Sequence, residues 1–163
     1  VTVVDTGIDT MTGGRVRRVR PFVGKGAFLA TYGDGVSDVD LGALVKFHRS
    51  HGKLATVTAV RPPSRFGVLR LGAGDAIDGF AEKPRLDHWI SAGFFVFEPG
   101  VFEYLEGDDT VLERGPMERL AADGQLRAYR HDGFFFAMDT YRDFLQLQDL
   151  WSRGRAPWKV WRD

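Results

Sequence analysis

The sequence predicts one α/β domain built on a mixed, mostly parallel sheet flanked by helices. Three observations carry this prediction. An apolar, strand-like run at 28–32 is followed by a helical pattern and then by the alternating, β-branched run 53–60. A second apolar strand-like run lies at 89–97. With 163 residues, of which 44% are hydrophobic and 27% charged, the chain is long enough to bury one ordinary globular core.

The first residues of the chain predict a beginning inside a longer protein. Residues 1–4 read as a strand already under way, without an initiator Met or a signal peptide, so we expect the true N-terminus to lie upstream. Residues 5–15 are polar and rich in glycine, which predicts a loop. In the basic stretch 16–23, arginines alternate with valines, which indicates a half-exposed helix or strand edge.

The segment after the first strand has the signals of a helix with defined ends. Either Asp38 or Asp40 is placed to cap a helix that runs to about His51, and Gly52 ends it. The strand 53–60 follows directly. Strand, helix and strand in this order form the unit of a parallel α/β sheet.

The rest of the chain alternates short strands and helices. We expect two strands joined near 72–75, a helix opened by Pro99, a helix at about 111–123, strands at 125–130 and 133–138, and a last helix capped by Thr140. The apolar residues expected on the inner side of that last helix are Phe144, Leu145, Leu147, Leu150 and Trp151. The tail after it exposes or docks two tryptophans.

Charge and residue usage exclude several classes of protein. Lys+Arg and Asp+Glu balance at 22 each, which argues against a nucleic-acid or membrane binder, since both need a basic surplus. No apolar run approaches the ~20 residues of a membrane span. Cysteine is absent, which excludes disulfides and is consistent with a cytoplasmic location.

Two aspartates follow apolar strands and are candidate metal ligands. Asp34 lies between Gly33 and Gly35, where the backbone can turn sharply and a ligand can come close. Asp139 follows the apolar run that ends at Met138. Both could hold one Mg²⁺, which needs few protein carboxylates when phosphates supply other ligands. The alternatives are a β-turn at Asp34 and helix capping at Asp139; spacing alone does not show that the two carboxylates meet.

A glutamate and a lysine at a further strand end are candidate substrate contacts. Glu82 and Lys83 precede Pro84, which stops the strand, and the lysine could hold a phosphate as a point charge. The alternative is a solvated surface ion pair. Gly67, in the stretch Ser64-Arg65-Phe66-Gly67, allows a ligand to approach the backbone N–H groups closely.

Taken together, these stretches resemble a known family. The motifs, in chain order, are VTVVDTG, MTGGR, FLATYGDGVSDVD, RFGVL, FAEKP, AGFFVF, GFFFAMDT and RGRAPWKVW. They are similar to bacterial glucose-1-phosphate cytidylyltransferases, within the sugar-phosphate nucleotidyltransferase superfamily, and the likeness runs from Val1 to about Trp161. The resemblance implies a Rossmann-like nucleotidyltransferase fold that lacks its first strands and triphosphate loop, with 1–163 as the C-terminal portion of that domain.

The resemblance also implies a reaction and roles for residues. CTP and α-D-glucose 1-phosphate would give CDP-glucose and pyrophosphate with Mg²⁺, in the cytoplasm and in a homo-oligomer. The residues that it implies are Asp34 and Asp139 for the metal, Thr10, Arg15 and Gly33 for the nucleotide, and Gly67, Glu82 and Lys83 for the sugar phosphate. Asp34, Lys83 and Asp139 would form the catalytic set.

Three departures from the family pattern limit what the resemblance implies. The triphosphate loop G-G-x-G-T-R is absent from the 163 residues, so we expect the chain by itself to be inactive. Ser91-Ala92 replaces the expected Asn-Gly beside the sugar, and Ala137 stands where proline is usual. Two alternatives remain open: a metal-dependent glycosyltransferase of the GT-A-like kind, which would use Asp34 and Asp38, and a non-catalytic nucleotidyltransferase remnant.

Overall fold

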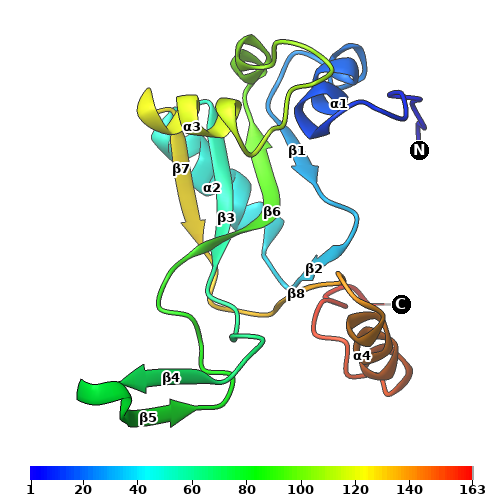
Figure 1. The fold of residues 1–163 in the computed structure, drawn as a ribbon. Coiled ribbons are helices and arrows are strands. Elements are labelled where there is room, and N and C mark those ends of the chain that lie inside the picture. The colour runs from blue at the N-terminus through cyan, green and yellow to red at the C-terminus, as the bar shows by residue number, and fades with distance from the viewer. Residues whose placement is uncertain (163) are drawn as a thin grey trace. The chain divides into compact units, whose positions relative to one another are not determined.

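A computed structural model describes residues 1–162, which form two compact units (Figure 1). The first unit contains Val1–Gly33, Asp40–Thr58 and Gly93–Tyr129. The second unit contains Asp34–Val39, Ala59–Ala92 and the chain from Arg130 onward. The chain crosses between them several times, so residues far apart in sequence meet within each unit.

The main sheet is four-stranded, in the order β1-β6-β3-β7. Its strands are β1 (Phe28–Thr31), β6 (Ile90–Phe97), β3 (Ala55–Val60) and β7 (Leu126–Arg130). β1 and β6 are antiparallel, with Phe28 opposite Phe97. The predicted strands at 28–32, 53–60, 89–97 and 125–130 are therefore confirmed, with ends shifted by one or two residues.

Hydrogen bonds at the strand ends give the remaining directions. The Glu98 N–H donates to the Leu54 carbonyl at 2.8 Å, so β6 ends where β3 begins and these two strands are antiparallel. β3 and β7 run parallel, because Ala55 bonds to Gln125 before β7 and His131 bonds to Ala59 after it. The predicted mixed α/β sheet is confirmed, but β6 lies between the two strands that the sequence suggested as neighbours.

The helices begin and end at the signals read from the sequence in two cases. α2 (Leu41–His51) is capped by Asp40, which accepts from the Ala43 N–H at 2.9 Å, and it ends at Gly52 with φ +62°. α4 (Tyr141–Ser152) begins at Thr140 with a full capping box. The remaining helices are α1 (Thr12–Arg18), α3 (Gly115–Ala122) and the 3₁₀ turns η1 (Arg20–Phe22), η2 (Ala73–Asp75) and η3 (Pro99–Tyr104).

Some local predictions are wrong. Residues 1–4 form no strand, because a strand needs a partner to satisfy its backbone and these residues do not pair within the described chain. The basic stretch contributes to a helix that already begins at Thr12, inside the predicted loop. The helix predicted at 111–123 is shorter. α3 begins only at Gly115, because Pro116 favours the first turn of a helix.

The hydrophobic core lies in the first unit. Phe28 stacks on Phe102 with ring centroids 5.5 Å apart, and Phe95 stacks on Phe97 at 5.3 Å. The buried members of this core are Phe28, Ala55, Phe95, Phe97, Val101, Phe102, Leu105, Leu112 and Leu120. Alternation along β6 and the single apolar face of α3 direct these side chains to one place.

The second unit consists of small elements, and its described residues form no comparable core. Its ribbons are β2 (Gly35–Ser37) with β8 (Phe135–Ala137), and β4 (Val68–Leu71) with β5 (Ile77–Ala81), both antiparallel (Figure 1). The predicted pair of strands joined near 72–75 is confirmed. No helix among the described residues is long and apolar enough to cross a membrane.

The inner side predicted for α4 is only half-covered. Leu147 and Leu150 are half-buried, whereas Phe144, Leu145 and Trp151 are exposed. The two tail tryptophans differ in the same way. Trp158 stacks on Phe134 with centroids 5.7 Å apart, and Trp161 is exposed.

Candidate active site

The β2–β8 ribbon brings the two candidate metal ligands to one end. Asp34 immediately precedes β2, and Asp139 follows β8 after one residue. The Met138 N–H donates to the Asp34 carbonyl at 2.8 Å, which continues the ladder to this point. Both aspartates are exposed. The antiparallel pairing therefore places two carboxylates, 105 positions apart in sequence, on neighbouring strand ends.

The Asp38 carboxylate, unlike that of Asp34, is bound to the turn before β8. Its Oδ1 atom accepts from the Phe134 N–H at 2.7 Å and lies 2.8 Å from His131 Nε2. A side chain at Gly133 would collide with the same oxygen. Because Asp38 holds the turn before β8, its carboxylate is already engaged. This does not favour the glycosyltransferase alternative, which needs Asp34 and Asp38 on one metal.

The loop 62–67 and the segment 82–86 lie side by side. The Ser64 N–H donates to the Pro84 carbonyl at 2.8 Å, and the Leu86 N–H donates to the Pro62 carbonyl at 3.0 Å. A Cβ atom added at Gly67 would lie 3.2 Å from Glu82 Oε2 and 2.7 Å from the ring of Phe80. Gly67 and Glu82 are thus neighbours, as a shared substrate pocket requires.

Lys83 has an unusual backbone conformation. Its φ is +47°, in the left-handed region of the backbone that residues other than glycine, asparagine and aspartate rarely adopt. Its Nζ lies 3.8 Å from Glu82 Oε1, and both side chains are more than half exposed. An exposed ion pair at this distance contributes little to stability. Strain of this kind is common at ligand sites, so Lys83 stays a candidate for substrate binding.

Arg65 connects the two halves of this unit's candidate site, and sequence reasoning missed it. Its guanidinium donates to Asp139 Oδ2 at 2.5 Å and to Asp143 Oδ2 at 3.5 Å. It is the residue after Ser64, whose N–H binds the Pro84 carbonyl. Only the folded chain brings Arg65 to an aspartate 74 positions away. The one signal in the sequence is its place between Ser64 and Phe66-Gly67.

Asp143 is fixed more firmly than Asp139. Its Oδ2 accepts from the backbone N–H groups of Thr140 at 2.9 Å and Asp139 at 3.2 Å. Hydrogen bonds from Thr140 hold the pKa of the Asp143 carboxyl below its usual value, against an opposing effect of desolvation, and the positive charge of Arg65 adds to the lowering. Asp143 is therefore ionised and anchored to the start of α4.

The residues assigned to the nucleotide lie in the first unit. Thr10 is 6% exposed, so its hydroxyl is enclosed by the surrounding chain. The Arg15 guanidinium binds Thr6 Oγ1 at 2.7 Å and the Ile8 carbonyl at 3.1 Å. Gly33 has open space where a side chain would stand. Of these three, Gly33 offers the clearest approach for a ligand, and the role of Thr10 stays a prediction.

The glycine pair of MTGGR has a packing explanation. A Cβ atom on Gly13 would come within 2.7 Å of the Thr110 side chain, and one on Gly14 within 2.6 Å of the Asp108 carbonyl. The Gly13 N–H donates to the Thr110 carbonyl at 2.8 Å. The two glycines therefore let α1 lie directly against the loop 107–110.

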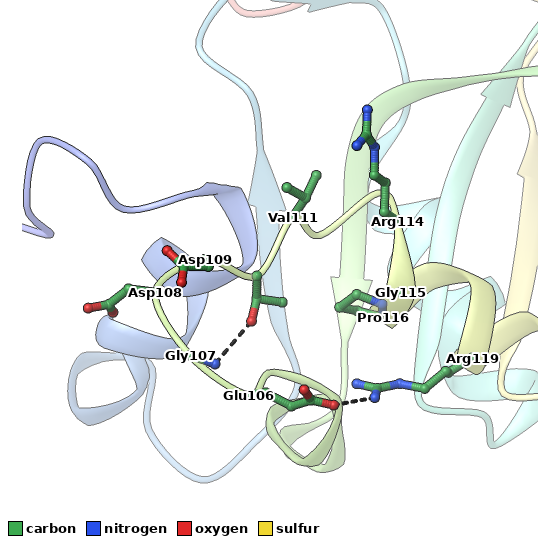
Figure 2. A pocket seen from close by; sticks show the side chains of 10 residues that line it. Glu106, Gly107, Asp108, Asp109, Val111, Arg114, Gly115, Pro116 and Arg119 are labelled. Carbon is green, nitrogen blue, oxygen red and sulfur yellow. Dashed lines mark hydrogen bonds and ion pairs between the residues drawn. The ribbon is translucent and has the colours of Figure 1, made fainter.

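That loop borders an open hollow of about 570 Å³ (Figure 2). Its lining residues are Glu106, Gly107, Asp108, Asp109, Thr110, Val111, Arg114, Gly115, Pro116 and Arg119. Two of the acidic side chains on its wall are already paired: Glu106 with Arg119, and Asp108 with Arg18 at 2.5 Å. None of the site residues predicted from the sequence lines it, so we do not assign the predicted metal or sugar-phosphate site to this hollow.

The carboxylates at the end of the β2–β8 ribbon can be compared with the ligands that Mg²⁺ needs. Among the residues that the structure describes, no three His, Asp or Glu side chains gather as a ready-made metal site. Asp34 and Asp139 are two exposed carboxylates, and the Asp139 carboxylate is paired with Arg65. Mg²⁺ commonly uses one or two carboxylates and takes its other ligands from phosphates and water. The two aspartates would therefore hold it together with a phosphate substrate.

Comparison with known proteins decides the family. Residues 12–157 match the nucleotidyl transferase family. The chain belongs to the nucleotidyl transferase family. It is 50% identical, over 99% of its length, to the glucose-1-phosphate cytidylyltransferase of Salmonella typhimurium. It is 34% identical, over 72% of its length, to the mannose-1-phosphate guanylyltransferase catalytic subunit beta of Drosophila pseudoobscura pseudoobscura.

A solved structure shares the fold of this chain. Apo UDP-glucose pyrophosphorylase superposes with a TM-score of 0.68 over 94% of this chain and 64% of that one, at 15% identity. This likeness confirms the α/β architecture with its mixed sheet and flanking helices. The chain spans 63% of the length of the Salmonella typhimurium relative.

Proposed function

We propose that this chain is part of an enzyme that transfers a cytidylyl group from CTP to α-D-glucose 1-phosphate, giving CDP-glucose and pyrophosphate. The observation that supports it most is the pairing of the loop 62–67 with the segment 82–86, which places Gly67, Glu82 and Lys83 together. The identity of 50% to a glucose-1-phosphate cytidylyltransferase supports this substrate pair.

The transfer is a direct displacement at phosphorus. A phosphate oxygen of glucose 1-phosphate forms a bond to the α-phosphorus of CTP while the bond from that phosphorus to the bridging oxygen breaks, and pyrophosphate leaves with the electron pair. Protein side chains need not react covalently, so catalysis consists of positioning and charge stabilisation. Mg²⁺, when bound, reduces the repulsion between the two anionic substrates.

Each candidate residue has a task in this scheme. Lys83 holds the phosphate of the incoming sugar phosphate, and Glu82 accepts hydrogen bonds from sugar hydroxyl groups. Gly67 leaves room for the sugar beside Glu82. Asp34 and Asp139 hold the metal on the phosphates.

The nucleotide has its own proposed contacts. Gly33 packs beside the nucleotide, and Thr10 and Arg15 contact it. We further propose that the enzyme works as a homo-oligomer in the cytoplasm.

The test is the formation of CDP-glucose by two proteins. One is the product of the complete reading frame that contains this chain, and the other is the 163-residue chain alone. We expect CDP-glucose and pyrophosphate in equal amounts from the first. We expect none from the second, because several charge-assisted phosphate contacts of the triphosphate loop, worth about 1.5–3 kcal/mol each, are absent from it.

Two results would contradict the proposal. Failure of the complete product to consume any nucleoside triphosphate with any sugar 1-phosphate would favour the non-catalytic remnant. If another nucleoside triphosphate is consumed and CTP is not, nucleotidyl transfer stands as the reaction but the assignment of cytosine as the base is wrong. Glucose and mannose 1-phosphates should be compared directly, because Ser91-Ala92 departs from the family pattern beside the sugar.

A further inference from the structure

Arg65 lies where its guanidinium could bind either the Asp139 carboxylate or a substrate phosphate. Its guanidinium lies 2.5 Å from Asp139 Oδ2, a proposed metal ligand. On the chain it is the neighbour of Ser64, whose N–H binds the carbonyl of Pro84, and Pro84 is the neighbour of Lys83. Arg65 and Lys83 thus each adjoin one partner of the same backbone hydrogen bond, so their backbones lie near each other.

The two carboxylates that contact Arg65 differ in freedom. The Asp143 side chain is 15% exposed and is fixed by the N–H groups of Thr140 and Asp139. The Asp139 side chain is 52% exposed, and Arg65 itself is 53% exposed. Asp143 can therefore keep its long contact with Arg65 while the contact between Arg65 and Asp139 is broken. Both Arg65 and Asp139 are exposed, so solvent leaves room for the guanidinium to move.

A divalent cation and Arg65 compete for Asp139. Both are positively charged. The Asp139 oxygen that accepts the short hydrogen bond from the guanidinium is less available to coordinate a metal. A guanidinium that leaves Asp139 prefers a phosphate, because its planar fork matches two phosphate oxygens. Binding of a phosphate near Lys83 would draw Arg65 away and expose Asp139.

We propose that Arg65 is a positioning residue that couples metal binding to the phosphate substrate. Without substrate it neutralises Asp139 and weakens the binding of a divalent cation. With a sugar phosphate present it moves to the phosphate, and Asp139 becomes available to the metal. This inference rests on the proposed function, because it takes Asp139 as a metal ligand and the segment 82–86 as the phosphate site.

The test measures Mn²⁺ binding to the complete reading-frame product by the loss of the free Mn²⁺ electron paramagnetic resonance signal. Titrations are made with and without glucose 1-phosphate and without nucleotide. For Arg65→Gln we expect Mn²⁺ alone to bind about two- to fivefold more tightly than for the wild type, the range that an exposed ion pair is worth. Glucose 1-phosphate should tighten Mn²⁺ binding in the wild type and much less in Arg65→Gln.

Matched variants separate this coupling from general charge effects. Arg70→Gln removes the same charge from the β4–β5 ribbon, where Arg70 donates to the Asp78 carbonyl at 3.0 Å, and should leave Mn²⁺ affinity unchanged. Arg65→Lys keeps the charge and should restore part of the coupling. By linkage, Mn²⁺ must tighten glucose 1-phosphate binding by the same factor in each protein, which gives an independent check.

The outcomes are distinct for the two proposals. Unchanged or weaker Mn²⁺ binding by Arg65→Gln, or a change equal to that of Arg70→Gln, overturns the role of Arg65. If Asp139→Asn binds Mn²⁺ as the wild type does, Asp139 is not a metal ligand and the metal assignment itself fails. Loss of binding in Asp139→Asn together with tighter binding in Arg65→Gln supports both.

Discussion

Two phenylalanines show how differently the two units use the same kind of residue. Phe97, on β6, is 0% exposed and packs on Phe95 and Phe28. Phe80, on β5, is 66% exposed, although it also lies on a regular antiparallel strand. The four-stranded sheet buries its apolar face, whereas the β4–β5 hairpin leaves Leu69, Leu71 and Ile77 open as well.

The comparison separates stability from chemistry. Burial of aromatic side chains supplies much of a domain's stability, so the first unit carries the free energy of folding. A two-stranded hairpin is at best marginally stable by itself. The second unit instead carries Lys83, Asp139 and Arg65, which are exposed and charged. Changes in the buried core of the first unit should therefore affect folding most, and changes at these exposed, charged residues of the second unit should affect binding and rate most.

The largest expected effect comes from the core. Phe97→Ala should lower the free energy of unfolding by about 3–5 kcal/mol, because it removes a buried ring and leaves a cavity. Phe80→Ala removes the same atoms from an exposed site and should change it by less than about 1 kcal/mol. Urea unfolding followed by circular dichroism measures both. Equal losses would show that the hairpin is packed in solution and would break the comparison.

The second effect is kinetic. In the complete reading-frame product, Lys83→Ala should raise the KM for glucose 1-phosphate and lower kcat, with the KM for CTP nearly unchanged. The loss of transition-state stabilisation should be about 2–4 kcal/mol, as for a charged contact to a reacting group. Initial rates of pyrophosphate release measure it, and urea unfolding should show unchanged stability.

Lys83→Arg is the matched control for that variant. It keeps the positive charge, but its larger, forked guanidinium should restore the rate only in part. A shift in the KM for CTP instead, or a change in kcat/KM below about threefold, would make Lys83 a mere surface partner of Glu82.

A smaller effect on stability should come from the cap of α4. The Thr140 side chain accepts from the Asp143 N–H at 3.2 Å, and every side chain of α4 is half-buried or exposed. With little burial to hold this helix, its cap has more weight. Thr140→Ala should lower the free energy of unfolding by about 1 kcal/mol. Hydrogen exchange of the α4 amides should rise, whereas the same measurement on α2 serves as the unchanged reference.

The smallest effect concerns pH and the polar network beneath α2. The Lys53 N–H donates to His51 Nδ1 at 3.0 Å, so we assign the His51 proton to Nε2, which faces Thr56 Oγ1 at 2.8 Å. Thr56 Oγ1 also lies 2.8 Å from Nδ1 of the buried His48, whose Nε2 is 3.2 Å from Glu98. The chain of donors and acceptors is complete when both rings are neutral.

Protonation of His51 should weaken the folded state. Burial, followed by the nearby His48, Arg127 and Lys53, lowers the pKa of His51 below its usual value. The unfolded chain therefore binds more protons, and stability is lost as pH falls below about 6.5. His51→Gln should reduce the difference in unfolding midpoint between pH 7 and pH 5, whereas His88→Gln, at an exposed position, should not. An unchanged pH dependence in His51→Gln would assign it to other groups.

Elements whose causes are local could be predicted from the residues alone. The Asp40 cap, the stop at Gly52 and the capping box of Thr140 and Asp143 depend on residues within one helical turn, so they could be read directly. The β4–β5 hairpin was predictable in the same way from its glycine-rich turn. Motifs also named Asp34, Asp139, Glu82 and Lys83 as site candidates.

Features that depend on partners distant in sequence became visible only in the folded chain. The fold places β6 between β1 and β3, leaves residues 1–4 without a partner strand, and exposes most of the apolar face of α4. The fold also pairs Arg65 with Asp139 and Asp38 with His131. The physical reason is the same in each case. Local preferences act through neighbours along the chain, whereas burial and ion pairing depend on which distant segments the fold brings into contact.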